Sequence, residues 1–543
     1  MRITLLITSF NSLSQLIYTY LKDKGDIVDV VFATSITLDA EIESFKPDLI
    51  LCPFLKHYIP ANIYEEYPTF VFHPGIRGDR GAYSLELALN QEEWGGVILK
   101  VDEKYDGGDI YASFGFNMRD TYKASIYRQE VKSGFFEILD EFFQNYKDDK
   151  KLPQILNPLN QKPNLKIDWQ KDTTKQIIKK INTLDSFPGI KDEIAGVKCH
   201  LFGVWQEERL SSDTPKKILA KRDGAICLST IDGAIWITHL KTPDGFKLPA
   251  TYVLKDRLKG VREDRLPLIF DMSYKTFYEI SSTQDNDVAY LCFNFHNGAM
   301  NSEQCIRLKY AFEHLKESAK VIVLVGGLDF FSNGIHLNIL EDSKKNGEDG
   351  WSNINAMNDL IKSIIFADDV ITVASLHRNS GAGGVFLALA CDYVTSSITS
   401  TLNPHYKTLG LSGSEYHTHT LKKRVGEKLS KKLLDECLPI SSTYAKNMGI
   451  VDAVFEDKEY FAKLRNFANQ LIDDEDSYDE FLWQKQDYLD ENKEMIEKAR
   501  EDEIKVMYSE FWNEDSPFHS LRYDFVYKIC PTQTPDRLKY KGK

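Results

Sequence analysis

Residues 69–84 read TFVFHPGIRGDRGAYS, an apolar run followed by a loop rich in glycine and arginine and then by the start of a helix pattern. The apolar run predicts a buried strand, and His73 comes directly after its last apolar residue. The residues before it alternate short apolar runs with helical stretches, which predicts a parallel sheet covered by helices on both faces. Loops at the carboxyl ends of such strands line the ligand crevice, so His73 is a candidate functional residue. The predicted strands are 3–8, 28–33, 48–52, 69–72 and 96–101, and the predicted helices are 13–22, 38–45 and 82–90.

A carboxylate follows in the sequence at a place where it can meet this histidine. Residues 101–112 read VDEKYDGGDIYA and place Asp106 in a glycine-containing turn between two predicted strands. A carboxylate beside an imidazole orients the ring and raises its basicity, so the pair can move a proton. A histidine after a strand is more often structural, and the residues alone leave both interpretations open.

The chain changes character after this first part. Residues 147–164 are polar and rich in proline and asparagine, which predicts a linker. After a predicted helix at 173–184, short strands alternate with turns up to residue 268. Asp223-Gly224 and Asp232-Gly233 are hairpin-type turns, and the pattern as a whole predicts a small β-barrel.

Strand–helix alternation returns from about residue 272. Residues 330–340 read FFSNGIHLNIL, and residues 379–392 read NSGAGGVFLALACD, a glycine-rich turn that opens an apolar helix. N–H groups at a helix start favour negative charge, and glycine lets a ligand approach the backbone closely. Close packing is the commoner explanation of either segment taken alone. The predicted strands are 288–295, 321–325 and 370–375, the predicted helices are 302–317 and 353–367, and the acidic, aromatic residues beyond 455 predict further helices of open function.

The composition restricts the class of protein. The net charge of −14 and the pI near 5.5 argue against general binding to nucleic-acid backbones. The best candidate for a membrane span, residues 370–394, is interrupted by His377, Arg378 and Asn379, so no span is predicted. The N-terminus predicts a strand rather than a signal peptide, and the eight cysteines form no CxxC pair. We therefore expect a cytoplasmic protein with reduced core thiols.

Motifs in the first half resemble those of the formyltetrahydrofolate-dependent formyltransferases. The resemblance covers residues 1–265 and rests on HPG, RG, WGG and DGGDI in that order, followed by IDWQ and LDSFPG within residues 167–189. It implies that His73 and Asp106 handle the formyl group of 10-formyltetrahydrofolate. The asparagine of that family, two residues before the histidine, is Val71 here. An amide donor to the formyl oxygen is therefore missing, which puts the usual amine acceptors in doubt.

Motifs in the second half resemble those of the crotonase superfamily, the enoyl-CoA hydratase/isomerase relatives. The resemblance covers about residues 275–460 and is most specific in FSNGIHL and SGAGGVFLALACD. It implies that the backbone N–H groups of Ile335 and Gly383 polarise a thioester carbonyl. The two glutamates of the hydratases correspond to Phe386 and His405, so hydration of an enoyl double bond is not expected.

Other proton-transfer groups lie in the same part of the sequence. Residues 411–419 read LSGSEYHTH, where Glu415 and Tyr416 are candidates to move a proton near the thioester. A surface loop in which Tyr416 merely packs explains the same residues. His417 and His419 have no third ligand at a recognisable spacing, so no metal site is predicted.

Further residues are predicted to bind the cofactors. The loop at residues 9–12 precedes the first helix and is placed to cradle the phosphates of CoA, although helix capping explains it equally well. The candidate cofactor-binding residues are Ser9, Asn11, Gln15, Arg77, Gly334 and Gly384.

The fusion of these two halves resembles the HypX/HoxX-type hydrogenase maturation factors. The resemblance implies a multidomain α/β fold in four parts. These are a Rossmann-like formyltransferase domain (1–160), a small OB-like β-barrel subdomain (165–268), a crotonase-like ββα-spiral domain (272–460) and a helical C-terminal extension (461–543).

The same resemblance implies an enzyme that makes the carbon monoxide ligand of nickel-iron hydrogenase. The formyl group would pass from 10-formyltetrahydrofolate to CoA, and formyl-CoA would then lose CO. CoA is expected to stay bound, with its pantetheine arm passing between the sites through an internal cavity. The expected partners are these small molecules and nickel-iron hydrogenase assembly proteins, with no nucleic acid and no membrane. Two alternatives stay open: a formyltransferase for amines with an inactive crotonase module, and a non-catalytic assembly scaffold.

Overall fold

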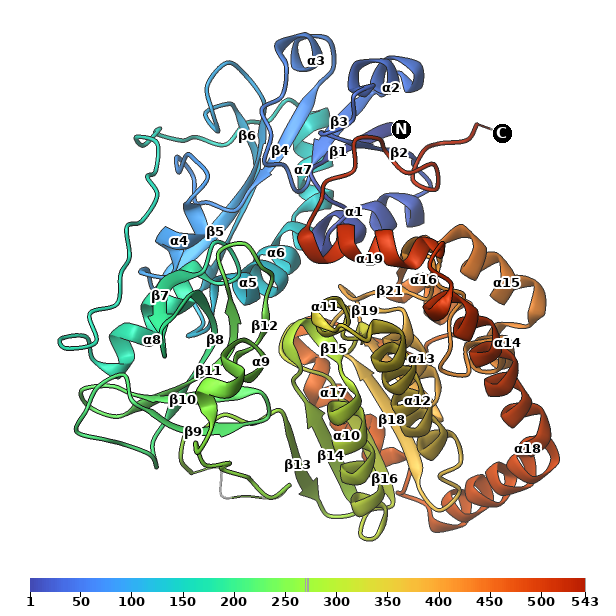
Figure 1. Ribbon diagram of the computed structural model, residues 1–543. Helices are drawn as coiled ribbons and strands as arrows, with labels where there is room; N and C mark the ends of the chain where they lie inside the picture. Colours follow the sequence, from blue (N-terminus) through green and yellow to red (C-terminus); the bar gives the residue numbers. More distant parts are fainter. Residues whose placement is uncertain (269, 271–272, 543) are drawn as a thin grey trace. The chain divides into compact units, whose positions relative to one another are not determined.

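The computed structural model describes residues 1–268, 270 and 273–542, which form two compact units (Figure 1). Unit 1 consists of Met1–Arg265, Met272–Phe277 and Cys530–Lys543, and unit 2 consists of Leu266–Asp271 and Tyr278–Ile529. The domain start expected at residue 272 and the expected end at residue 543 lie outside the described residues.

The first part of unit 1 is a six-stranded sheet in the order β2-β1-β3-β4-β5-β6. Its first four strands are parallel as predicted, because helices connect them, but β5 and β6 run antiparallel to their neighbours. The expectation of a wholly parallel sheet is therefore wrong. The short α4 turns the chain back, and no helix separates β5 from β6. The strands are β1 (Arg2–Ile7), β2 (Ile27–Phe32), β3 (Leu49–Cys52), β4 (Thr69–His73), β5 (Glu93–Lys100) and β6 (Ile110–Asn117).

The helices of this part cover the sheet. The first of them begins where the Asn11 side chain accepts a hydrogen bond from the Ser14 amide. The helices are α1 (Ser12–Asp23), α2 (Leu38–Phe45), α3 (Ala61–Glu66), α4 (Ser84–Ala88), α5 (Lys123–Ile126), α6 (Lys132–Glu137) and α7 (Leu139–Lys147), with a π-helical turn (Tyr127–Val131) between α5 and α6.

The second part of unit 1 is an antiparallel sheet in the order β7-β8-β11-β10-β9, with β12 beside β11. Asp223 and Gly224 both have positive φ and form the predicted two-residue hairpin turn. The predicted barrel is wrong, because within residues 165–268 the edge strands β7 and β9 do not pair. The strands are β7 (Ile190–Ile194), β8 (Val197–Glu207), β9 (Ile218–Arg222), β10 (Ala225–Ser229), β11 (Ala234–Lys241) and β12 (Leu248–Pro249), followed by α9 (Ala250–Leu254) and a 3-10 turn (Lys255–Leu258).

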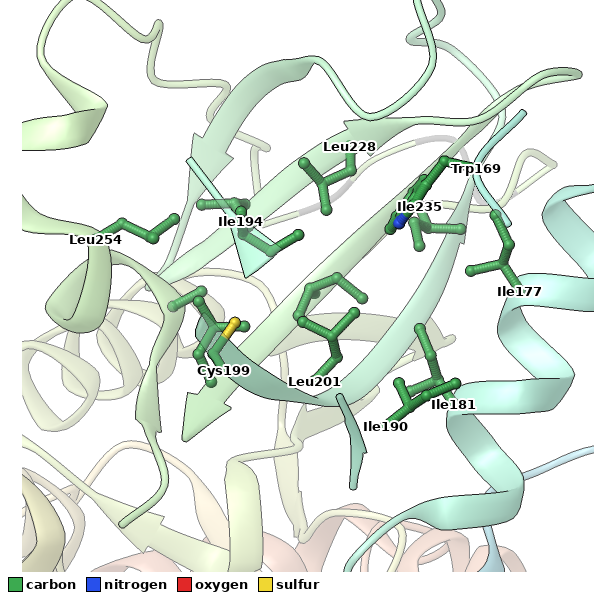
Figure 2. Packing of buried hydrophobic residues seen from close by; sticks show 14 of the residues in the cluster. Trp169, Ile177, Ile181, Ile190, Ile194, Cys199, Leu201, Leu228, Ile235 and Leu254 are labelled. Carbon is green, nitrogen blue, oxygen red and sulfur yellow. The ribbon is translucent and has the colours of Figure 1, made fainter. Parts of the chain in front are cut away.

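A helix buries the apolar face of this open sheet. α8 (Thr174–Leu184) begins with a capping box between Thr173 and Gln176. Its Ile177 and Ile181 pack against strand residues such as Leu201 (Figure 2). Because the helix removes this face from water, the sheet does not need to close on itself.

Unit 2 is built on a sheet in the order β13-β14-β16-β18-β20-β23, parallel except for β13. Its strands are β13 (Ile280–Asp285), β14 (Val288–Phe293), β16 (Val321–Val325), β18 (Ile371–Leu376), β20 (Tyr393–Ser397) and β23 (Ala453–Phe455). Two small sheets lie apart from it and consist of β15 (Ala299–Met300) with β17 (Gly334–Ile335), and of β19 (Ser380–Gly381), β21 (Thr401–Asn403) and β22 (Ile440–Ser441).

Helices make up most of the rest of unit 2, and those beyond residue 455 confirm the prediction of helices there. They are α10 (Ser302–Lys316), α11 (Leu337–Asp342), α12 (Asn346–Ile365), α13 (Gly383–Leu389), α14 (His417–Val425), α15 (Glu427–Glu436), α16 (Ser442–Asn447), α17 (Tyr460–Gln470), α18 (Glu475–Trp512) and α19 (Pro517–Tyr527), with 3-10 turns at His296–Gly298, Lys407–Leu409 and Asp457–Glu459.

The last residues of the chain belong to unit 1. There the Tyr540 amide donates to Asp29 Oδ1 at 2.6 Å, and the Phe32 amide donates to Thr534 Oγ1 at 2.9 Å. All eight cysteines lie among the described residues, and none is in a disulfide. In the part of the chain that the structure describes, no helix is long and apolar enough to cross a membrane.

Candidate functional site

The first site is centred on His73, at the carboxyl end of β4, where the ring is 5% exposed. Its Nε2 lies 2.9 Å from Asp79 Oδ2, and its Nδ1 lies 3.5 Å from Asp106 Oδ2. The structure therefore brings the two sequence-predicted residues together. It adds Asp79, which the sequence analysis missed, as the nearer of the two carboxylates.

The two carboxylates differ in their electrostatic surroundings. Burial disfavours the charged form of Asp79, but hydrogen bonds from His73, Ser84 and Asn160 outweigh it and hold the pKa of Asp79 below its usual value. Burial raises the pKa of Asp106, and the attraction of His73 offsets only part of that effect. Asp79 is thus suited to hold the imidazole as a fixed anion, and Asp106 is suited to take up or release a proton.

The loop after β4 is tied to two other segments. Arg80 Nε donates to the Tyr105 carbonyl at 2.8 Å, and the Gly81 amide donates to Asp106 Oδ2 at 3.0 Å. The segment predicted as a linker has no helix but is well bonded, because the Asn157 amide donates to the Gly78 carbonyl at 2.9 Å.

This linker also delivers an amide side chain to the site. Asn160 Nδ2 donates to Ser84 Oγ at 3.0 Å, and Asn160 Oδ1 accepts from the Tyr83 amide at 3.0 Å. Ser84 Oγ in turn lies 3.4 Å from His73 Nε2. An asparagine is therefore present near the histidine although Val71 occupies the position of the family's asparagine in the sequence.

Gly75 is predicted to be indispensable for this geometry. A Cβ atom at Gly75 would lie 2.2 Å from Asp79 Oδ2 and 2.4 Å from His73 Nε2, so Gly75→Ala must separate the pair. We expect this change to lower the free energy of unfolding by about 1–3 kcal/mol and to alter the His73 imidazole resonances in NMR spectra. Gly115→Ala is the matched control, because a Cβ there meets its nearest atom at 3.6 Å. Equal effects of the two changes would contradict the prediction.

The predicted cofactor-binding residues of unit 1 have local partners. Asn11 caps α1 and donates from Nδ2 to Tyr127 Oη at 3.0 Å, while the Ser9 carbonyl accepts from the Asn11 amide at 2.9 Å. Gln15 Nε2 donates to the Phe10 carbonyl at 2.9 Å. Arg77 donates to Ser113 Oγ from Nε at 3.0 Å and from its terminal nitrogen at 2.8 Å. Their role toward a cofactor stays a prediction.

The second site lies in unit 2, where the two glycine-containing segments meet. A Cβ atom at Gly334 would lie 3.2 Å from the Gly383 amide nitrogen, so Ile335 and Gly383 belong to neighbouring stretches of backbone. Gly383 is the first residue of α13, and its amide has no acceptor within that helix. Gly384 packs on the Ser332 carbonyl, which a Cβ would approach to 2.1 Å. Its structural role here is close packing of the backbone.

Glu415 lies directly against Gly383. A Cβ atom at Gly383 would be 2.6 Å from Glu415 Oε1, and the carboxyl group is almost fully buried. Tyr406 Oη donates to Glu415 Oε2 at 2.6 Å. Burial raises the pKa of Glu415, and burial together with the charge of Glu415 raises the pKa of Tyr406 well above its usual value. The Tyr406 hydroxyl is therefore hydrogen-bonded to the Glu415 carboxyl group next to an expected oxyanion donor.

Tyr416, the second candidate of this segment, has a different environment from Glu415, and its role in proton transfer stays a prediction. Its hydroxyl faces Arg500, which pairs with Asp359 at 2.7 Å, and burial raises the pKa of Tyr416 to about 12. The tyrosine that contacts Glu415 is Tyr406, which the sequence analysis missed. Glu415 and Tyr416 both have positive φ, and their side chains have different partners.

Phe386 and His405 are the residues that the resemblance assigned to the hydratase glutamate positions. Phe386 stacks on Tyr406 with centroids 5.4 Å apart, and His405 Nδ1 lies 3.5 Å from Thr408 Oγ1. His417 and His419 do not converge, because His417 Nδ1 faces Glu503 while His419 Nε2 faces Tyr488. No group of three or more metal-ligand side chains occurs among the described residues.

The comparisons with known proteins agree with both halves. The family model for enoyl-CoA hydratase/isomerase matches residues 283–526, and the model for the C-terminal domain of formyl transferases matches residues 160–257. The hydrogenase maturation factor HoxX of Bradyrhizobium diazoefficiens is 33% identical over 98% of this chain and 96% of its own length. The chain belongs to the HypX/HoxX family of hydrogenase maturation factors.

Further matches extend this assignment to HypX/HoxX. The crystal structure of HypX from Aquifex aeolicus in complex with tetrahydrofolic acid has a TM-score of 0.96 and 39% identity, over 100% of this chain and 99% of the other. The methionyl-tRNA formyltransferase of Pseudothermotoga lettingae is 27% identical over 38% of this chain and 68% of its own length. The HypX/HoxX fold thus combines a formyltransferase part and a crotonase-like part in this chain.

Proposed function

We propose that this chain makes carbon monoxide for the nickel-iron hydrogenase active site in two steps. Formyl transfer from 10-formyltetrahydrofolate to CoA comes first, and loss of CO from formyl-CoA follows. One observation carries the proposal: a single chain has a histidine between two carboxylates in unit 1 and a buried Tyr406–Glu415 pair at Gly383 in unit 2. A carrier thiol connects the two chemistries.

In the first step, the CoA sulfur attacks the formyl carbon and the bond from that carbon to N10 of the folate breaks. The thiol loses a proton and N10 gains one, so the site has to take up one proton and return it. His73, held by Asp79, fits this role, and the raised pKa of Asp106 suits a group that stores the proton between the two transfers. The amide of Asn160, bonded to Ser84 beside the His73 ring, is the proposed substitute for the donor missing at Val71.

In the second step, formyl-CoA gives CO and free CoA. The formyl hydrogen leaves as a proton, the carbon–sulfur bond breaks with its electron pair on sulfur, and the thiolate takes up a proton. In this proposal Glu415 accepts the first proton and Tyr406 supplies the second, and a proton transfer along the hydrogen bond between them restores both groups. The N–H groups of Ile335 and Gly383 hold the thioester oxygen.

CoA is proposed to stay bound during both steps. Retention raises the effective concentration of the thioester at the second site and limits its hydrolysis by water. The proposed partners of the product step are proteins of nickel-iron hydrogenase assembly.

The test supplies purified protein with 10-formyltetrahydrofolate labelled with ¹³C in the formyl group, and with CoA. We expect labelled CO, detected by its binding to deoxyhaemoglobin, and labelled formyl-CoA as an intermediate, detected by mass spectrometry. Omission of CoA should stop both. Transfer of the label to an amine such as an amino sugar in place of CoA would favour the amine formyltransferase. No transfer to any acceptor would favour the assembly scaffold.

A further inference from the structure

One face of the long helix α18 contacts a short segment of unit 2. The residues of that face are Glu503, Met507 and Glu510, spaced by four and three along the helix so that they lie on one side. The segment is residues 412–418, which contains Glu415 and leads into α14. Both elements belong to the same unit, and α14 packs on α18 (Figure 1).

The contacts fix the segment at both of its ends. At the start, the Ser412 amide donates to both oxygens of the Glu510 carboxylate, at 3.0 and 3.1 Å, and Ser412 Oγ donates to it at 3.2 Å. The Gly413 amide lies 3.2 Å from Met507 Sδ. At the end, the amide and the hydroxyl of Thr418 donate to Glu503 Oε1 at 2.8 and 2.5 Å.

The segment needs such support because its backbone is strained. Glu415 has φ of 64° and Tyr416 has φ of 55°, in the left-handed region that side chains with a Cβ rarely adopt. Such conformations persist only where the surrounding structure over-determines them. The strained residues lie between the two ends held by α18, and the Asn358 side chain supports the middle by accepting from the Glu415 amide at 2.9 Å.

The same face of α18 is connected to the Tyr406–Glu415 pair through His417. Glu503 Oε1 lies 3.2 Å from His417 Nδ1, and the His417 ring contacts the Tyr406 ring edge-on with centroids 5.3 Å apart. The Ser414 carbonyl lies 3.0 Å from His417 Nδ1 and 3.1 Å from Tyr406 Oη. Because both of its neighbours are acceptors, His417 Nδ1 carries a hydrogen and donates.

We propose that Glu503, Glu510 and Met507 of α18 are positioning residues that hold residues 412–418 in the strained conformation and thereby aim Glu415 at Tyr406 and Gly383. The effect on CO release rests on the proposed function, whereas the stabilisation of residues 412–418 by α18 does not. The inference gives the acidic C-terminal helix a role. Its carboxylates, of which Glu503 is buried and Glu510 is half-buried, accept hydrogen bonds from a loop of the second site.

The hold on the segment is tested by amide hydrogen exchange in the full chain. In Glu503→Ala, we expect the amides of residues 412–418 to exchange about ten- to a hundredfold faster than in the unchanged protein, because a charged acceptor is lost. Glu503→Gln keeps an acceptor oxygen and should restore part of the protection. Glu501→Ala, on an exposed position of the same helix, is the matched control and should leave the exchange unchanged.

Thr418→Val gives a milder disruption from the other side of the contact, in case Glu503→Ala does not fold. It removes the hydroxyl donor to Glu503 and keeps the shape of the side chain. The inference would be overturned if residues 412–418 exchange as slowly in Thr418→Val, and in any Glu503 variant that folds, as they do in the unchanged protein. Exchange that accelerates equally over all of unit 2 would overturn it too, since it would mean a general loss of packing.

The consequence for chemistry is measured separately, with supplied formyl-CoA. Faster exchange should be accompanied by a kcat for CO release that is lower by about tenfold or more, with KM within about twofold, because a misaimed Glu415 affects the step after binding. If the unchanged protein releases no CO from formyl-CoA, the proposed function is wrong. The exchange experiment then still tests whether α18 holds residues 412–418 in place. If exchange accelerates but kcat does not change, the positioning role is wrong.

Discussion

Replacing His73 with alanine is expected to slow formyl transfer from 10-formyltetrahydrofolate to CoA by about 10²–10⁴-fold, the range that a positioned acid–base group contributes. Among the contacts of the described residues at this site, the His73 ring is the group that lies within 3.5 Å of both Asp79 and Asp106. Without it, the thiol proton has no route to N10 of the folate. The measurement is the rate of formyl-CoA formation in a single turnover.

The same His73→Ala protein should release CO from supplied formyl-CoA at the unchanged rate, because His73 and the Tyr406–Glu415 pair belong to different units. Asp106→Asn should follow the same pattern, since it removes the group that stores a proton. Asp79→Asn should act differently and also lower the free energy of unfolding, because Asp79 is the hydrogen-bonded anion beside the ring. Loss of both steps in a folded His73→Ala protein would contradict the division into two sites.

The sequence was sufficient to predict groups that follow regular elements. His73 is the last residue of a strand and Asp106 lies in a turn between two strands, and sheet topology brings the two together. Gly383 begins a helix with an apolar pattern, so its place could also be predicted. These positions depend on short-range patterns that one sequence displays.

Asp79, Asn160 and Tyr406 could not be found in the same way. Asp79 and Asn160 lie in irregular segments, and backbone hydrogen bonds between loops bring them to the ring. Such contacts leave no periodic signal in the sequence. The HPG motif with a following aspartate is the only available hint for Asp79.

Tyr406 illustrates why neighbours in sequence need not act together. Tyr416 is adjacent to Glu415 in the sequence. The sequence alone does not show which side chain contacts the Glu415 carboxylate. In the structure the Tyr416 hydroxyl faces Arg500, and Glu415 meets Tyr406, nine residues earlier. Phe386, which the crotonase resemblance places at a hydratase glutamate position, stacks on Tyr406. The departure from the hydratase pattern and the new pair are therefore parts of one arrangement.

Replacing Tyr406 with phenylalanine is expected to slow CO release from formyl-CoA by about 10²-fold or more, with formyl-CoA accumulating when folate and CoA are supplied. The ring and its stacking on Phe386 are retained, so only the hydroxyl bonded to Glu415 is lost. The thiolate formed when the carbon–sulfur bond breaks then has no proton donor beside it. The free energy of unfolding should fall by about 1 kcal/mol, the contribution of one hydrogen bond.

Tyr416→Phe is the matched comparison, because it removes the phenolic oxygen from the other candidate tyrosine. The structure predicts that this change leaves formyl-CoA turnover near its starting rate, since the Tyr416 hydroxyl faces Arg500 and not Glu415. Mass spectrometry of the thioester and CO trapped by deoxyhaemoglobin together give both rates. A larger loss in Tyr416→Phe than in Tyr406→Phe would return the proton-transfer role to the tyrosine adjacent to Glu415. The short Tyr406–Glu415 hydrogen bond would then be only a structural contact.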